Sequence, residues 1–266
     1  MSERVVRREV IAAEPVEAMA GLLDVDPPRD GQVPELWHWV HLLERRPSRD
    51  LGADGHPTSG IPAPPGPGMR RMFAGGRVET RRRLRVGEPA TRTTWVASEA
   101  EKQGRSGPLR LVTVRHEIHQ ADELAIAEEQ DIVYRAPGGS LPMEPGAGLP
   151  VREPTIMLDV DERLLFRFSA LTYNAHRIHY DRAWCTREGY DDLVVHGPLQ
   201  ALMMGELARR NGLSLVGRRF GYRLVSPMVG PQRMHVLPAD DGLAGGAEVR
   251  TADGRVTAVS SLAGLG

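Results

Sequence analysis

The sequence lacks several features that define whole classes of protein. Cys185 is the only cysteine among 266 residues, which excludes an intrachain disulfide framework and a thiolate metal cluster. No apolar run approaches the ~18 residues that a membrane span needs. Residues 1–9 are charged and lack the apolar core of a signal peptide. We therefore expect a cytoplasmic protein without a membrane partner.

An excess of charge of either sign is also lacking. The 34 basic residues are balanced by 35 acidic ones, and a net charge of −1 creates no field that would attract nucleic acid. Lys102 is the only lysine, and the abundant arginine suits anionic ligands. There is no P-loop and no G-x-G-x-x-G after a strand, and the nine histidines lack the H-E-x-x-H spacing. We expect no nucleic-acid partner, no metal and no separate cofactor.

The first half of the chain combines a helix, a long loop and a run of strands. Apolar spacing predicts a helix within residues 9–24, and the proline- and glycine-rich residues 45–69 predict a long ordered loop or lid. Four segments at roughly ten-residue spacing predict an antiparallel sheet. These are Arg77–Val86, Ala90–Glu101, Leu109–His119 and Leu124–Tyr134.

The second half repeats this plan. Residues Leu164–Ser169 are interpreted as a strand and Arg182–Glu188 as a short helix. The apolar segment Pro198–Asn211 predicts a long helix that ends at Gly212, and the Met203/Met204 pair is assigned to its core side. Further strands are predicted at Leu215–Val225, Gln232–Pro238, Gly245–Arg250 and Val256–Leu262.

A long apolar helix followed by an antiparallel sheet suggests that the sheet wraps the helix, in an α+β arrangement. That is how a hotdog fold is built. Two such halves predict a double hotdog, in which two sheets, each around a central helix, join edge to edge with the active site between them. The predicted domains are 1–135, a linker at 136–154, and 155–266, with the active site in the last.

The most informative residues lie at Asn174–Asp181 and His196–Pro198. Acid–base chemistry on an acyl group needs a proton-transferring imidazole, a group that orients water and N–H donors for an oxyanion. His179 has an ordinary pKa near ~6.5 that suits the first role. Asn174 cannot take a proton but can orient water. The helix start at Gly197 offers amides without intrahelical partners.

Each of these residues also has a structural interpretation. His179 could be a loop histidine satisfied by backbone groups, and His176 either a second acid–base group or a residue that fixes the loop. Arg177 could bind a carboxylate or a CoA phosphate, or be solvated. A basic strand that places Arg81, Arg83 and Arg85 on one face would be a solvated face or a CoA phosphate patch.

The segment from Asn174 to Asp181 resembles the G-D-x-N-P-x-H signature of the (R)-specific enoyl-CoA hydratases, the MaoC-like or hydratase-2 proteins. Asn174 stands where that family has Asp, His176 where it has Asn, and Arg177 where it has Pro. With these differences, the motif is similar to that of one branch, the mesaconyl-C4-CoA or itaconyl-CoA hydratases with an N-terminal dehydratase-like hotdog. Four first-half segments agree with that branch: residues 36–39, 72–77, 104–108 and 128–134.

The resemblance implies an acyl-CoA hydratase or dehydratase that adds or removes water across the Cα=Cβ bond of an enoyl thioester. The implied substrate is a short branched dicarboxylic acyl-CoA, with no cofactor, and a homodimer is possible. A 3-hydroxyacyl-thioester dehydratase of fatty-acid metabolism and a non-catalytic acyl-CoA-binding hotdog protein remain alternatives. The implied catalytic residues are His179 and Asn174, and the implied oxyanion or substrate-binding residues are Gly197, His196, His176 and Arg177.

Overall fold

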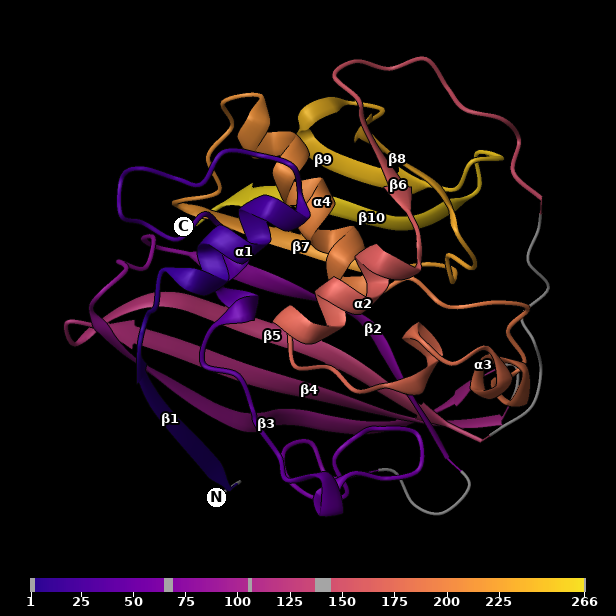
Figure 1. The fold of residues 1–266 in the computed structure, drawn as a ribbon, viewed down its shortest axis with the longest axis horizontal. Helices are drawn as coiled ribbons and strands as arrows, with labels where there is room; N and C mark the ends of the chain where they lie inside the picture. The colour runs from indigo at the N-terminus through magenta and orange to yellow at the C-terminus, as the bar shows by residue number, and fades with distance from the viewer. Residues whose placement is uncertain (1–2, 65–68, 105–106, 137–144, 266) are drawn as a thin grey trace.

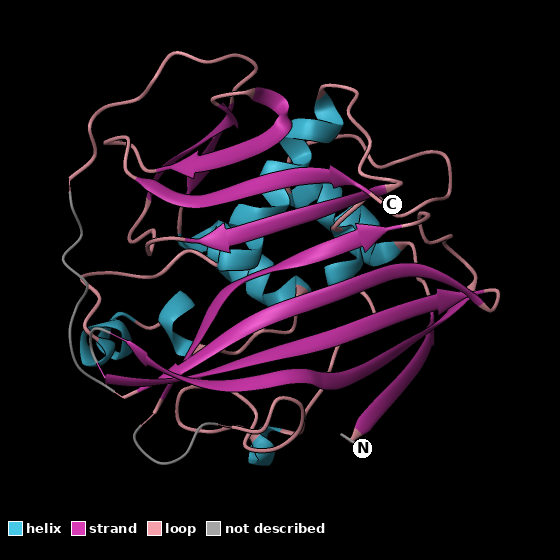
Figure 2. Cartoon of the chain, turned by 180° about the vertical axis from the view of Figure 1, so that it is seen from behind, coloured by secondary structure: helices cyan, strands magenta, loops and turns pink. Residues whose placement is uncertain are grey.

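The computed structural model describes residues 3–64, 69–104, 107–136 and 145–265. Their strands form one ten-stranded antiparallel sheet in the order β1-β3-β4-β5-β2-β7-β10-β9-β8-β6. The helices α1, α2 and α4 lie together on one face of this sheet (Figure 1), and the view from behind shows the strands in front of them (Figure 2). Within the described residues, no helix has the length and apolar character needed to span a bilayer.

The first half supplies five strands and one α-helix. Three of the four predicted strands are confirmed with shifted ends, whereas only residues 77–80 of the predicted strand Arg77–Val86 are strand, at the end of β2; the predicted helix within residues 9–24 is α1. An edge strand, β1, precedes them and was not predicted. The elements are β1 (Arg4–Val10), α1 (Glu14–Leu22), β2 (Arg70–Thr80), β3 (Pro89–Gly104), β4 (Gly107–Gln120) and β5 (Glu123–Arg135), with 3-10 turns at Trp37–Val40 and Ser48–Asp50.

The second half supplies the other five strands and three α-helices. The predicted long helix is α4, whose Met203 and Met204 are buried in the core as expected. The elements are β6 (Ile156–Val160), α2 (Glu162–Leu171), a 3-10 turn (Arg177–His179), α3 (Arg182–Glu188), α4 (Gly197–Arg210), β7 (Arg218–Leu224), β8 (Gln232–Ala239), β9 (Gly242–Arg250) and β10 (Val256–Gly264).

The two halves meet where β2 pairs with β7, so their sheets join edge to edge as predicted. The register runs from Gly75 opposite Arg223 to Thr80 opposite Arg218. A Cβ on Gly75 would lie 2.3 Å from the carbonyl oxygen of Tyr222, and the φ of Gly75 is +150°. Glycine is therefore required at this position, because a side chain would push the two strands apart.

Helix α4 is the central element of the core. Ten consecutive residues, Leu199–Ala208, are buried, so the helix is enclosed by the sheet and by the first-half loop. The carboxylate of Glu206 is buried within this core and accepts a hydrogen bond from Nε1 of Trp37 at 2.9 Å. It also pairs with Arg209 and Arg210, which compensates its burial. The contact of Glu206 with Trp37 ties α4 to the first half.

The predicted strand at Leu164–Ser169 is wrong, because these residues belong to helix α2. Asp161 caps this helix, with Oδ1 accepting a hydrogen bond from the amide of Leu164 at 2.9 Å. Leu164, Leu165 and Phe168 are buried on one side of it. A short apolar run does not by itself distinguish a buried strand from a helix, and here the cap decides.

The predicted basic strand is also wrong. Strand β2 ends at Thr80, so Arg81, Arg83 and Arg85 lie beyond it and do not alternate across a sheet. The guanidinium of Arg83 pairs with Glu35 at 3.1 Å. These arginines therefore do not form the predicted phosphate-binding face of a strand.

The predicted linker and loop are seen only in part. Residues 137–144 of the linker, 65–68 of the long loop and 105–106 of the β3–β4 turn lie outside the described residues. Residues 145–154 contain neither helix nor strand. The first half has no counterpart of α4 among its described residues, since α1 spans only nine residues.

Candidate active site

The loop after α2 places the predicted catalytic residues. Oδ1 of Asn174 accepts a hydrogen bond from the amide of His176 at 2.9 Å, a short turn closed by the side chain. The 3-10 turn Arg177–His179 follows, and Asp181 then caps α3 by accepting from the amide of Trp184 at 3.0 Å. Side-chain caps on both sides therefore fix the backbone around His179.

His179 is held as a neutral imidazole with a defined tautomer. Its Nδ1 lies 2.7 Å from the carbonyl oxygen of Val194, so Nδ1 carries the proton and Nε2 keeps its lone pair. Burial and the neighbouring His176 lower the pKa of His179 to about 3, against the opposing effect of the Val194 hydrogen bond. The side chain is only 7 % exposed. Nε2 is thus available as a proton acceptor.

His196 and Gly197 form the start of α4 beside this histidine. The rings of His179 and His196 are stacked, with centroids 3.6 Å apart. Nε2 of His196 contacts the hydroxyl of Ser169 at 2.8 Å, whereas its Nδ1 is buried without a hydrogen-bond partner in the described part of the chain. The amide of Gly197, at the first position of α4, has no intrahelical acceptor.

Gly197 also lies close to two side chains of the junction. A Cβ at this position would lie 2.2 Å from Cδ1 of Leu224 and 3.3 Å from Cδ1 of Phe73. These two residues come from β7 and β2, the strands that join the halves. The helix start therefore lies against the junction, and a larger residue at this position would require the Leu224 side chain to move.

Arg177 has its donors engaged within the protein. The guanidinium binds Asp181, with Nε 3.0 Å from Oδ2, and donates from Nη1 to the carbonyl oxygen of Ala53 at 3.1 Å. It also lies over the ring of Trp184, 4.3 Å from the centroid. These contacts connect the second-half loop with the first-half loop around residue 53.

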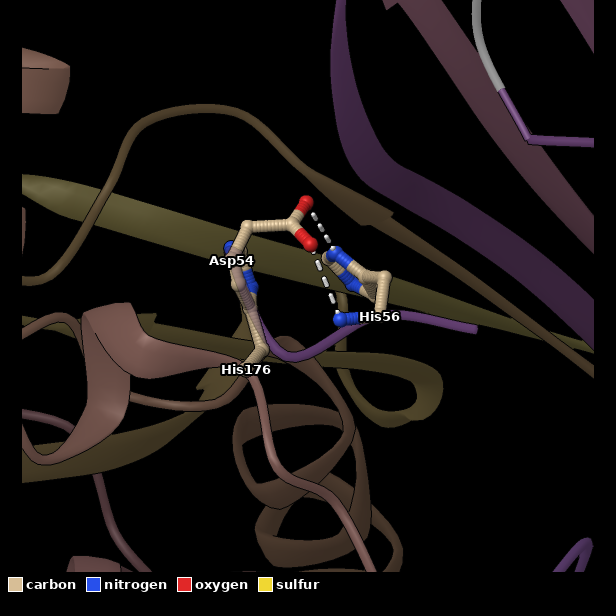
Figure 3. A group of neighbouring side chains, drawn as sticks. All are labelled: Asp54, His56 and His176. Carbon is tan, nitrogen blue, oxygen red and sulfur yellow. Dashed lines mark hydrogen bonds and ion pairs between the residues drawn. The ribbon is translucent and has the colours of Figure 1, made fainter. Parts of the chain in front are cut away.

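A cluster missed by the sequence analysis lies behind His176. The first-half loop brings Asp54 and His56 against it, and Figure 3 shows the three side chains together. Nδ1 of His56 lies 3.0 Å from Oδ2 of Asp54, and the rings of His56 and His176 have centroids 4.0 Å apart. One ligand atom from each of the three residues lies within 4.8 Å of the others, so the group has the dimensions of a metal site.

The hydrogen bonds explain this cluster without a metal. Both oxygens of Asp54 accept from His56, one from its amide and one from its ring. Burial acts to raise the pKa of Asp54, but these hydrogen bonds outweigh it and lower that pKa to about 2. Burial lowers the pKa of His56 to about 4, with repulsion from His176 in the same direction. Asp54 and His56 lie in the first-half loop, far in sequence from His176 in the second half, which is why no motif pointed to this group.

A cavity of about 150 Å³ lies between the two halves. Thr172 and Pro198 line it from the second half, next to the loop that carries Asn174 and His179 and to the start of α4. Trp39 and Phe73 line it from the first half, together with buried and half-buried polar residues of β3, β4 and β5. That the first half walls an acyl pocket stays a prediction.

Comparisons with known proteins identify the family. The model of the family "Hydroxyacyl-thioester dehydratase type 2" matches residues 36–230. The chain is 44% identical over 261 residues to the mesaconyl-C(4)-CoA hydratase of Chloroflexus aurantiacus, covering 94% of this chain and 91% of that protein.

Solved structures agree on the fold. HtdX of Mycobacterium tuberculosis matches with a TM-score of 0.72 at 16% identity, covering 99% of this chain and 100% of HtdX. Another M. tuberculosis protein, described as a double hotdog, matches with a TM-score of 0.54 at 15% identity, covering 99% of this chain and 96% of that one. The predicted α+β double hotdog is confirmed. The chain belongs to the hydroxyacyl-thioester dehydratase type 2 family and is a hydro-lyase that adds water to, or removes it from, an enoyl thioester.

Proposed function

We propose that this protein hydrates a short branched dicarboxylic enoyl-CoA, with mesaconyl-C4-CoA as the first candidate and itaconyl-CoA as the second. The observation that carries this proposal is the 44% identity, over 94% of the chain, to a mesaconyl-C(4)-CoA hydratase. The cavity of about 150 Å³ between the halves offers a place for the acyl group.

Gly197 supplies the oxyanion donor in this proposal. The thioester carbonyl oxygen accepts a hydrogen bond from the Gly197 amide, at the positive end of α4. This interaction draws electrons from the conjugated double bond, so Cβ becomes open to attack by water. Negative charge that develops on the carbonyl oxygen is stabilised at the same point. His196, which precedes Gly197, positions the helix start through its contact with Ser169.

His179 transfers the proton. Its Nε2 accepts a proton from water while the water oxygen bonds to Cβ and the double-bond electrons move onto the thioester oxygen. The protonated imidazole then returns that proton to Cα as the enolate collapses, so one water is consumed and the enzyme is regenerated. The enolate charge favours the protonated imidazole while the intermediate exists, although burial lowers the pKa of His179 in the resting protein.

The remaining predicted residues orient these groups. Asn174 uses its oxygen to hold the amide of His176, which leaves its NH₂ group to orient water or a substrate oxygen. His176 packs between His56 and His179 and fixes the loop against the first half. Arg177 joins the loops through Asp181 and Ala53, and we assign it a positioning role.

The predicted assembly and location belong to the same proposal. We retain a division into residues 1–135, a linker at 136–154 and residues 155–266, with an acyl-CoA as substrate. A homodimer and a cytoplasmic location stay predictions.

The experiment follows the ultraviolet absorbance of the conjugated enoyl thioester during hydration, with mesaconyl-C4-CoA, crotonyl-CoA and an enoyl-acyl carrier protein. Itaconyl-CoA, whose double bond is not conjugated, is followed by chromatography of the product. We expect kcat/KM for a dicarboxylic substrate to exceed that for crotonyl-CoA by about tenfold or more, since a matched polar group contributes at least that much. Turnover of the carrier-protein substrate alone would favour the fatty-acid dehydratase. Binding without any turnover would favour the acyl-CoA-binding protein.

A further inference from the structure

The polar wall of the cavity between the halves contains a half-buried cation that has no carboxylate partner. Arg92, near the start of β3, lines this cavity. No acidic oxygen lies within 4.0 Å of its guanidinium in the described part of the chain, and its Nε is buried without a hydrogen-bond partner. Burial, followed by repulsion from Arg7, lowers its pKa from the ordinary value. The buried Nε is an unused hydrogen-bond donor, and an anion bound beside this guanidinium would offset the cost of its partial burial.

The acidic group that lines the cavity with Arg92 already has hydrogen-bond donors of its own. Glu128 accepts hydrogen bonds from Nε1 of Trp39 at 2.9 Å and from Nε2 of Gln130 at 2.8 Å, and lies 3.1 Å from Nε2 of His38. Burial acts to raise the pKa of Glu128, but the contact with His38 and the neighbouring His116 lower it to about 2. Glu128 is thus a stable carboxylate with its own donors, and it does not form an ion pair with Arg92.

The cavity also reaches the reacting end of the site. Thr172 and Pro198 line it, and Pro198 directly follows the proposed oxyanion donor Gly197. An acyl group whose carbonyl lies at the start of α4 would therefore extend toward Arg92. His116 lines the same wall, and burial lowers its pKa to about 4, so it is neutral at pH 7. Arg92 is then the cation of this wall that remains for a ligand.

We propose that Arg92 binds the free carboxylate of the acyl group and so selects dicarboxylic over monocarboxylic enoyl-CoA substrates. This inference rests on the proposed function and assigns its substrate specificity to one residue. The planar guanidinium suits a carboxylate, which it can hold with two parallel hydrogen bonds. In mesaconyl-C4-CoA the carboxylate is attached to Cβ, the carbon that water attacks. Fixing it therefore also fixes the face of the double bond that is presented to His179.

The test compares Arg92→Gln and Arg92→Lys with wild type. The readout is the ratio of kcat/KM for mesaconyl-C4-CoA to that for crotonyl-CoA. We expect Arg92→Gln to lower this ratio about 30-fold or more, because it removes one partner of a desolvated charge pair. For Arg92→Lys, which keeps the positive charge but not the planar guanidinium, we expect a ratio between those of Arg92→Gln and wild type. Arg8→Gln, which removes an exposed arginine from the neighbouring strand β1, is the matched control and should leave the ratio unchanged.

A binding measurement separates this inference from the proposed function. Calorimetry with methylsuccinyl-CoA linked through C4, and with isovaleryl-CoA, which has a methyl group in place of the carboxylate, needs no turnover. Selective weakening of methylsuccinyl-CoA binding by Arg92→Gln, about 30-fold, would support the carboxylate site even if wild type hydrated neither enoyl-CoA. Equal weakening of both ligands, or unchanged binding of both by a variant with a wild-type circular dichroism spectrum, would overturn it.

Discussion

The imidazole ring of His179 lies against that of His196, with centroids 3.6 Å apart and planes inclined by 19°. Burial, followed by repulsion from His179, holds the pKa of His196 well below its ordinary value. A charge on either ring would repel a charge on the other, so the pair stays neutral in the resting protein. The stacking also places the proposed base next to the residue that precedes the proposed oxyanion donor, Gly197.

The neutral state of His179 predicts an unusual pH–rate profile. Its pKa of about 3 keeps Nε2 unprotonated above pH 4. We therefore expect kcat/KM with mesaconyl-C4-CoA to be nearly constant between about pH 5.5 and 8, because the proposed base His179 stays unprotonated throughout this range. The profile is measured from initial rates, with the fold checked at each pH. A tenfold loss of kcat/KM per pH unit below pH 6.5, in the folded protein, would contradict it.

Stability should fall on mild acidification. Burial lowers the pKa of His41, His56 and His116 to about 4, from an ordinary 6.5. Between these values the unfolded chain binds protons that the folded protein does not, so stability is present above pH 6.5 and is lost as pH falls toward 4. Urea unfolding at pH 7 and pH 5 should differ by about 2 kcal/mol for each group. The loss should be smaller in His116→Gln, and an identical loss would show that His116 does not contribute.

At position 174 we expect a side chain with a hydrogen-bond acceptor to preserve activity and a hydrocarbon side chain to reduce it. Asn174→Asp keeps an oxygen that can accept from the amide of His176, whereas Asn174→Leu leaves this amide unpaired. We expect the leucine variant to lose about 1 kcal/mol of stability. Its kcat should fall about tenfold or more, because the loop that carries His179 would shift. The aspartate variant should stay within a few-fold of wild type. Equal kcat values for the leucine variant and wild type would exclude any role of the side chain in orienting the site.

Gly197→Ala should impair the oxyanion site by displacing the start of α4. The new methyl group would overlap Cδ1 of Leu224, and overpacking of this kind costs about 1–3 kcal/mol. We expect kcat/KM to fall at least about tenfold, with part of the loss restored in the double variant Gly197→Ala/Leu224→Ala. Steady-state kinetics of the two single variants and the double variant measure this coupling. Additive effects would contradict the steric explanation.

The parts of the fold that the sequence predicts well have strong local signals. Helix α4 has an apolar pattern, a proline in its first turn and Gly212 after its end. The strands of the two meanders are separated by glycine-rich turns. The edge strand β1 was not predicted, because Arg4–Val10 mixes charge with valine and has one neighbour in the sheet. The short apolar run of α2 is compatible with a strand or a helix, and the cap by Asp161 makes it a helix.

The candidate site also contains residues that the sequence predicts and residues that it does not. The segment with Asn174 and His179 is recognisable because its residues are adjacent in sequence. Asp54 and His56 have no such signal, since a long-range contact brings them there: the amide of Arg177 donates to the carbonyl oxygen of Asp54 at 2.9 Å. Arg92 has only a weak sequence signal for a role in binding, because it is a single charge in a strand. The position of the cavity is what points to this residue.

The most direct test of the central claim, that His179 transfers the proton, is the turnover of mesaconyl-C4-CoA by His179→Ala. Loss of the enoyl-thioester absorbance should slow about 10²–10⁴-fold relative to wild type, the usual contribution of a general acid–base group. His235→Ala, which removes a histidine of β8 outside this site, serves as the matched control and should keep wild-type turnover. If His179→Ala hydrates the substrate at nearly the wild-type rate, His179 is not the catalytic group.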